Sequence, residues 1–97
     1  MKIALLGKGK TGGKVLEQFP NATVFDSKNA PSFEKLNGHD VIISFLPGEA
    51  FLSYVPLLIE SKIPVVTGST GFTWPVNLNQ TLEKNELCWI HATNFSL

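Results

Sequence analysis

A chain of 97 residues is long enough for one domain with one core, and a hydrophobic content of 43% excludes an intrinsically disordered chain. Eight basic and eight acidic side chains cancel, so no net charge attracts the chain to nucleic acid or to an anionic membrane. The single cysteine, Cys88, excludes an internal disulfide and a cysteine-cage metal site, and no metal is predicted. Because Cys88 lies in an apolar run, we expect an inert core thiol.

The predicted elements alternate between strands and helices. In chain order they are a strand at 2–6, a helix at 10–19, a strand at 22–25, a helical turn near 33–36, a strand at 40–45, a helix at 48–61, a strand at 63–67, a helix at 75–84 and a strand at 87–92. Pro56 lies inside the longest helix, which it is expected to kink or divide. The alternation predicts one α/β domain over residues 1–97, a Rossmann-like doubly wound parallel sheet in three layers. Its ligand is expected at the carboxyl ends of the strands.

No targeting segment is recognisable in the sequence. The first apolar run, residues 3–6, is too short for the core of a signal peptide or for a membrane span. A cytoplasmic location is therefore expected.

Residues 5–15, LLGKGKTGGKV, belong to two overlapping phosphate-binding patterns: a relaxed P-loop and the G-x-G-x-x-G turn of dinucleotide-binding folds. A P-loop would place Leu5 and Leu6 around a phosphate, where each would lose burial worth about 1.5–3 kcal/mol. The third predicted strand also ends without an acid to hold magnesium. The dinucleotide turn keeps both leucines in the strand, so we favour it, with a plain tight turn as the alternative.

In a dinucleotide turn, each glycine has a separate reason. Gly7 turns the chain, Gly9 lets the backbone approach the pyrophosphate, and Gly12 lets the helix pack on the strand. The pyrophosphate would meet free N–H groups at the start of the helix. Three side chains of the same turn would be its neighbours: Lys8, Lys10 and Thr11. Of these, Lys10 is expected to steer the pyrophosphate, with a solvated lysine as the alternative.

Asp26 ends the second predicted strand, 19 residues after Gly7, where an acid would bind the hydroxyls of the adenosine ribose. A carboxylate at this place repels a 2′-phosphate and favours NADH. Lys28, two residues later, would pair with that phosphate, so NADPH stays open as a cofactor. The alternative for Asp26 is a simple turn residue at the end of a strand.

Four stretches match motifs of one family. IALLGKGKTGGKV has the form of its first turn, VVTGSTGF at 65–72 that of V-I-G-T-T-G-F, and ATNFSL at 92–97 that of A-x-N-F-S-x-G. DVIISFLPGEAF at 40–51 stands where the family has D-V-x-I-D-F-T-x-P-E. Together they resemble the amino-terminal domain of dihydrodipicolinate reductase, the 4-hydroxy-tetrahydrodipicolinate reductase of lysine and diaminopimelate synthesis.

The resemblance implies a nicotinamide site made by two later segments. Gly68, Ser69 and Thr70 would lie at the nicotinamide, with Thr70 near the substrate. A second segment would close around the ring through its backbone and the face of its aromatic residue: Ala92, Thr93, Asn94 and Phe95. From the residues alone, the first segment is a Ser/Thr turn and Phe95 a core aromatic.

The chain departs from the family pattern at the end of the third strand. Ser44 replaces an Asp, Leu46 replaces a Thr or Ser, and Pro47-Gly48 lies one step from the usual proline. We therefore expect altered hydrogen bonding beneath the cofactor and an altered loop.

The family's paired-histidine and lysine motif, which binds substrate and supplies the proton, has no match here. No catalytic residue is therefore expected in this chain. His91 lacks an acid partner and is expected to be structural or adjacent to the cofactor, and His39 to lie in a loop.

The resemblance implies the NADH- or NADPH-binding domain of a longer reductase. A missing domain would hold a small dicarboxylate substrate, and the enzyme would form a homo-oligomer. The isolated domain would bind cofactor without useful turnover. The alternatives are a free-standing NAD(H)-binding regulatory module and the cofactor domain of another Rossmann oxidoreductase.

Overall fold

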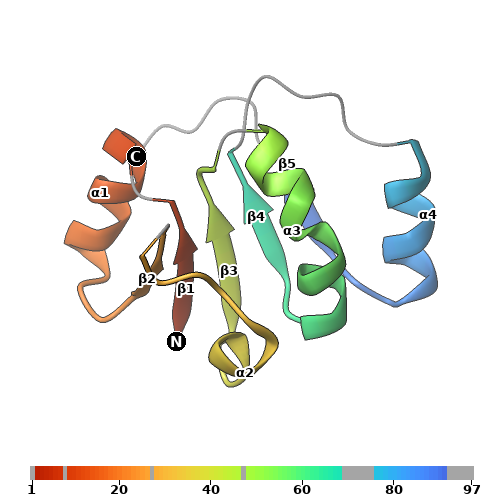
Figure 1. The fold of residues 1–97 in the computed structure, drawn as a ribbon, viewed down its shortest axis with the longest axis horizontal. Helices are drawn as coiled ribbons and strands as arrows, with labels where there is room; N and C mark the ends of the chain where they lie inside the picture. Colours follow the sequence, from red (N-terminus) through yellow and green to blue (C-terminus); the bar gives the residue numbers. More distant parts are fainter. Residues whose placement is uncertain (1, 8, 27, 47, 69–75, 92–97) are drawn as a thin grey trace.

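Five parallel strands form one sheet in the order β2-β1-β3-β4-β5 in the computed structural model, which describes residues 2–7, 9–26, 28–46, 48–68 and 76–91 (Figure 1). The elements are β1 (Ile3–Leu6), α1 (Gly9–Gln18), β2 (Thr23–Phe25), α2 (Phe33–Leu36), β3 (Val41–Ser44), α3 (Gly48–Ser61), β4 (Val65–Thr67), α4 (Val76–Lys84) and β5 (Trp89–His91). Each predicted element is present, with ends shifted by at most two residues. The predicted Rossmann-like sheet is confirmed.

The strand order places a change of direction between β1 and β3. From β1 the chain crosses to β2 on one side, and from β3 it continues to β4 and β5 on the other. In sheets of this kind the ligand binds in the crevice outside the carboxyl ends of the two strands where the direction changes. These ends lie at the top of Figure 1, where α1 and α3 begin.

The larger part of the core lies between the sheet and the helices α2 and α3. Ala4, Ile42 and Val65 are register partners across β1, β3 and β4, and all three are fully buried. They belong to one cluster with three helical side chains: Leu36, Phe51 and Leu58. This face of the sheet is therefore sealed by long apolar side chains from both helices.

Pro56 lies inside α3, which runs without interruption over Gly48–Ser61. Of the two expected effects of this proline, the division of the helix is therefore wrong, and the kink stays a prediction. The proline is exposed, whereas Phe51 before it and Leu58 after it are both fully buried. Packing of both halves against the same sheet outweighs the hydrogen bond that the proline removes.

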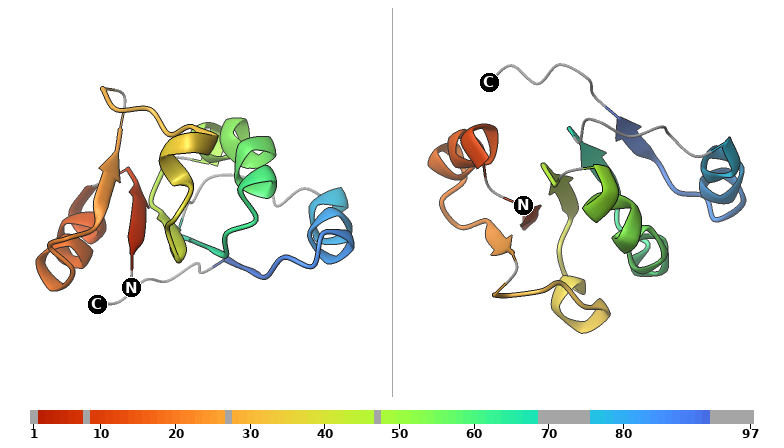
Figure 2. Two further views of the ribbon diagram at one scale, coloured as in Figure 1. Left: turned by 90° about the horizontal axis from the view of Figure 1, so that it is seen from below. Right: turned by 45° about the horizontal axis from the view of Figure 1, so that its top comes forward.

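The opposite face of the sheet carries α1, which lies beside β1 and β2 (Figure 2). Leu5, Ile43, Val66 and Ile90 form the row of register partners on this face. Leu5 is fully buried, but Ile90, on the edge strand β5, is 55% exposed. Burial on this face therefore falls from the centre of the sheet to its edge.

The same edge explains why the prediction of a buried Cys88 is wrong. Trp89 turns toward α3, where its ring meets Phe51 edge-to-face at a centroid distance of 6.0 Å. Side chains alternate along extended backbone, so the residues on either side of Trp89 point the other way. Cys88 is accordingly exposed.

The part of the chain that the structure describes offers neither a membrane-spanning helix nor a cluster of metal ligands. None of its helices is long and apolar enough to span a membrane. Nor do the described residues contain a group of three or more His, Cys, Asp or Glu side chains that would hold a metal ion.

Candidate functional site

Gly7 makes the turn between β1 and α1. Its φ of +73° lies in the left-handed region that favours glycine. A Cβ on this residue would lie 3.1 Å from Leu46 Cδ2 and 3.3 Å from the Leu46 nitrogen. The Gly7 N–H donates to the Phe25 carbonyl at 3.0 Å. Conformation and space therefore both require glycine here, where the chain leaves β1 between β2 and β3.

Leu5 and Leu6 lie in β1 and are 0% and 1% exposed. The strand register that excludes a P-loop is therefore confirmed. The helix α1 begins at Gly9, so the N–H groups of residues 9–12 have no acceptor within the helix and lie at its N-terminus. Free N–H groups at a helix N-terminus carry partial positive charge and bind phosphate.

Several predicted contacts of this turn lie outside the described residues. Lys8 itself lies outside them. Nothing is described for the side chains of residues 9–12, which include Lys10 and Thr11. Their contacts with a pyrophosphate, and the roles of Gly9 and Gly12, stay predictions.

Asp26 directly follows β2, at the same edge of the sheet. Its Oδ1 accepts hydrogen bonds from the backbone N–H groups of Lys28 and Asn29, both at 2.9 Å. Asp26 and Lys28 are both exposed. The carboxylate is thus a turn-forming group, as the alternative interpretation held, and it also lines the adjacent pocket.

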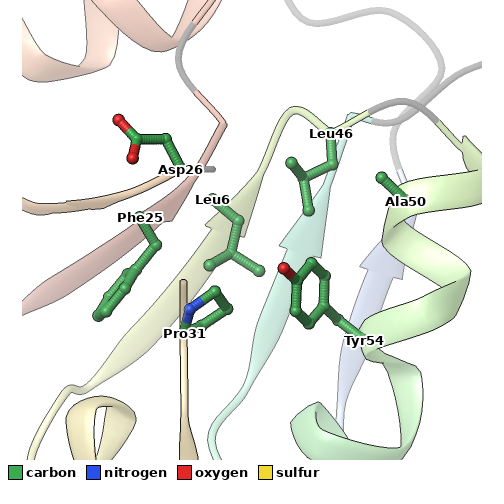
Figure 3. A pocket seen from close by; sticks show the side chains of 7 residues that line it. All are labelled: Leu6, Phe25, Asp26, Pro31, Leu46, Ala50 and Tyr54. Carbon is green, nitrogen blue, oxygen red and sulfur yellow. The ribbon is translucent and has the colours of Figure 1, made fainter. Parts of the chain in front are cut away.

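The pocket has a volume of about 200 Å³ and lies beside the carboxyl ends of β1, β2 and β3. Its lining residues are Leu6, Phe25, Asp26, Pro31, Leu46, Ala50 and Tyr54 (Figure 3). Tyr54 reaches from α3 across the pocket toward Pro31, and Asp26 lies on the β2 side. The Tyr54 phenol lies among mainly apolar walls, and Asp26 borders the pocket with its carboxyl group directed away from the other lining side chains. Such a lining suits a flat ligand with a polar end.

The departures from the family pattern place a small hydroxyl and an apolar side chain in the turn after β3. Ser44 is fully buried, and its Oγ accepts the Leu46 N–H at 3.4 Å. Its carbonyl accepts the Gly68 N–H at 2.8 Å. Ser44 thus supports the turn, while Leu46 forms a wall of the pocket and occupies the space that a Cβ on residue 7 would need.

The predicted nicotinamide residues are described only in part. Gly68 directly follows β4, at the same edge of the sheet as Gly7 and Asp26. Ser69, Thr70 and residues 92–95 lie outside the described residues, so their roles stay predictions.

The structure describes the side chain of one of the two histidines. His91 lies on β5 as the register partner of Thr67, and nothing is described of its side chain. His39 lies in a loop, as predicted. Its Nδ1 is 2.9 Å from the Leu36 carbonyl and therefore carries the proton, and its Nε2 is 3.1 Å from the Thr23 hydroxyl. His39 is thus a structural link between β2 and the loop before β3.

Six pocket residues were not among the predicted site residues: Leu6, Phe25, Pro31, Leu46, Ala50 and Tyr54. A usable signal existed for two of them. Ala50 and Tyr54 are four residues apart on the helix that follows a glycine turn at the carboxyl edge, so they share one face of that helix. Pro31 carried no such signal, because only the folded loop brings it to α3.

The doubly wound sheet, the glycine turn before a helix, the acid after the next strand and the apolar pocket beside them define an α/β domain of the dinucleotide-binding class. The family model described as "Dihydrodipicolinate reductase, N-terminus" matches residues 4–95, and the chain belongs to that family. The predicted resemblance is thereby confirmed.

Two individual proteins show the extent of the likeness. A 4-hydroxy-tetrahydrodipicolinate reductase from Christiangramia forsetii is 32% identical over 103 residues, and the match covers 100% of this chain and 43% of that protein. The chain thus spans less than half the length of this relative. A solved structure, "Haloferax mediterranei glucose dehydrogenase in complex with NADP, Zn and gluconolactone", is similar over 99% of this chain and 37% of that one, at 9% identity and a TM-score of 0.49.

Proposed function

We propose that the chain is the NAD(P)H-binding domain of a reductase that acts on 4-hydroxy-tetrahydrodipicolinate in lysine and diaminopimelate synthesis. The observation that carries cofactor binding is the pocket between Asp26 and Tyr54, which adjoins the Gly7 turn at the change of strand direction. Family membership supports the substrate and the reaction. A cytoplasmic, homo-oligomeric enzyme is part of the same proposal.

The residues of the site fit the adenosine end of a dinucleotide. Tyr54, Pro31 and Leu46 offer apolar surfaces to the adenine ring, and Tyr54 is placed to stack on it. Asp26 accepts a ribose hydroxyl at the side of the same pocket. A carboxylate there favours NADH over NADPH, because it repels a 2′-phosphate.

The direction of the sheet supports an assignment for the rest of the cofactor. The N-terminus of α1 and Gly7 would hold the pyrophosphate, with Lys8, Lys10 and Thr11 as its predicted neighbours. The nicotinamide would be held by the segment after β4, which includes Gly68 and the predicted residues Ser69 and Thr70, and by residues 92–95. When bound, the cofactor supplies the hydride, and the chain supplies binding and orientation.

A second domain is proposed for the remaining chemistry. The chain spans 43% of its relative, and its own residues include no proposed proton donor. Binding of the dicarboxylate substrate and donation of the proton are therefore assigned to that domain. The 97 residues by themselves are expected to bind cofactor without useful turnover.

Calorimetric titration tests the cofactor assignment. NADH, NADPH and magnesium-ATP are added separately to the purified chain, with adenosine as a fragment that fills the pocket alone. Saturable binding is expected for NADH at sub-millimolar concentration, weaker binding for NADPH and none for magnesium-ATP. No binding of either nicotinamide cofactor at millimolar concentration would contradict the proposal.

A further inference from the structure

Asn29 connects three parts of the loop after β2. Its Nδ2 donates to the Val24 carbonyl at 3.1 Å, and its Oδ1 accepts from Lys35 Nζ at 3.0 Å. Its backbone N–H donates to Asp26 Oδ1 at 2.9 Å. One residue thus links the strand β2, the helix α2 and the carboxylate beside the pocket.

The carboxylate of Asp26 is held by this same loop. Oδ1 accepts two backbone N–H groups, while the Asp26 N–H donates to the Asn29 carbonyl at 3.1 Å. Hydrogen bonds to an ionised carboxylate are among the stronger ones in proteins. Oδ1 is therefore engaged by the protein, and Oδ2 accepts nothing from any residue that the structure describes.

Lys35 completes the arrangement from α2. The Ser32 hydroxyl accepts the Lys35 N–H at 3.2 Å, which fixes the first turn of α2. The Lys35 ammonium donates to Asn29 Oδ1 and, at 3.4 Å, to the Ala30 carbonyl. Because the ammonium is a donor only, it orients the Asn29 amide with its oxygen toward α2 and its NH₂ toward β2.

We propose that Asn29, held by Lys35, is a positioning residue that makes Asp26 select a 2′-hydroxyl over a 2′-phosphate. The inference rests on the proposed function and adds the residue that sets the cofactor preference. A ribose hydroxyl donates to Oδ2 of the fixed carboxylate. A 2′-phosphate at the same place is repelled by the negative charge of Asp26, because the hydrogen bonds to Oδ1 keep the carboxylate from reorienting.

Loss of the Asn29 side chain removes two hydrogen bonds that hold the loop, those to the Val24 carbonyl and from Lys35 Nζ. The carboxylate then reorients, and the backbone N–H groups of Lys28 and Asn29 that it had occupied become donors for a phosphate. NADH loses a placed acceptor, whereas NADPH loses a repulsion. The two affinities therefore move toward each other, which damage to the fold in general does not cause.

The test measures dissociation constants of NADH and NADPH by calorimetry on the full chain. The ratio of the NADPH constant to the NADH constant is expected to exceed one. Asn29→Ala should lower the ratio at least fivefold, Lys35→Met should lower it less, and Asp26→Asn should bring it near one. Asn37→Ala is the matched control, because Asn37 is an exposed asparagine at the other end of α2, and it should leave the ratio unchanged.

The ratio protects the test against a loss of folded protein, which raises both constants by the same factor. A ratio in Asn29→Ala within twofold of the unsubstituted chain, or a ratio below one in the unsubstituted chain, overturns the inference. If the unsubstituted chain binds neither cofactor, the proposed function fails and the inference falls with it. If it binds NADH normally and the ratio does not move, only the inference fails.

Discussion

Two pockets of similar size lie at opposite ends of the sheet. The first, at the carboxyl ends, has a volume of about 200 Å³, and the second, at the amino ends of β1 and β2, has about 170 Å³. The second is lined by Ile3, Gln18, Phe19, Pro20, Asn21 and Ala22. It has no charged side chain in its lining, whereas Asp26 lines the first. Size therefore does not distinguish the two pockets.

The direction of the chain distinguishes them. Helices α1 and α3 begin at the carboxyl ends and present free N–H groups there, with the partial positive charge of a helix N-terminus. The second pocket meets the C-terminal end of α1, whose last turn contains no basic residue. A dinucleotide, with its charged pyrophosphate, is therefore expected only at the first.

The largest expected effect comes from filling each pocket in turn. Ala50→Trp places an indole in the first pocket and should abolish measurable NADH binding. Ala22→Trp does the same in the second pocket and should leave the affinity for NADH within twofold. Both alanines are half-buried, so they are comparable substitutions. Calorimetry measures the binding, and equal losses in the two variants would remove the distinction between the pockets.

Gly7→Ala is expected to cost both stability and affinity. The positive φ alone costs about 1–3 kcal/mol for a residue with a Cβ, and the contacts at 3.1 and 3.3 Å to Leu46 add to it. Gly13→Ala is the control, since Gly13 lies within α1 and a Cβ there meets nothing within 4 Å. That change should stabilise the fold by about 0.5–1 kcal/mol. Urea unfolding measures the stability of both variants, and calorimetry measures their affinity for NADH. A neutral Gly7→Ala would contradict the close approach of Gly7 to Leu46.

Asp26→Asn is expected to weaken NADH binding about tenfold or more, because a hydrogen bond to a charged group contributes about 1.5–3 kcal/mol. Asp40→Asn provides the control at the amino end of the sheet. Asp40 Oδ2 accepts the Lys2 N–H at 2.6 Å, so this change should lower stability and leave NADH affinity unchanged. If Asp40→Asn impaired binding as much as Asp26→Asn, the carboxyl end would have no special role.

The smallest expected effect is at Tyr54. Tyr54→Leu removes an aromatic surface worth about 0.5–1.5 kcal/mol, so the affinity for NADH should fall about threefold to tenfold. Tyr54→Phe keeps the ring and should stay within twofold of the original affinity. The same titration with adenosine should show a similar loss for Tyr54→Leu. An unchanged affinity in Tyr54→Leu would place the adenine ring elsewhere.

Local patterns in the sequence were enough for the order of elements and for one end of the site. Each of three features depends on only a few neighbouring residues: the run ending at Leu6, the glycine at position 7 and the acid at position 26. The strand register that excludes a P-loop followed from the burial of two leucines, which the structure confirms. These features depend on spacing along a single element, and spacing is visible in the chain itself.

The tertiary structure alone decided the features that depend on which segments become neighbours. Cys88 is exposed because β5 is an edge strand, and α3 continues through Pro56 because both halves pack on one sheet. The pocket exists because Pro31 and Tyr54, 23 positions apart in the sequence, meet across it. Asn29 is linked to Val24 and Lys35 only once the loop between β2 and α2 has folded. Strand order and loop closure set these contacts, and neither has a local signature in the sequence.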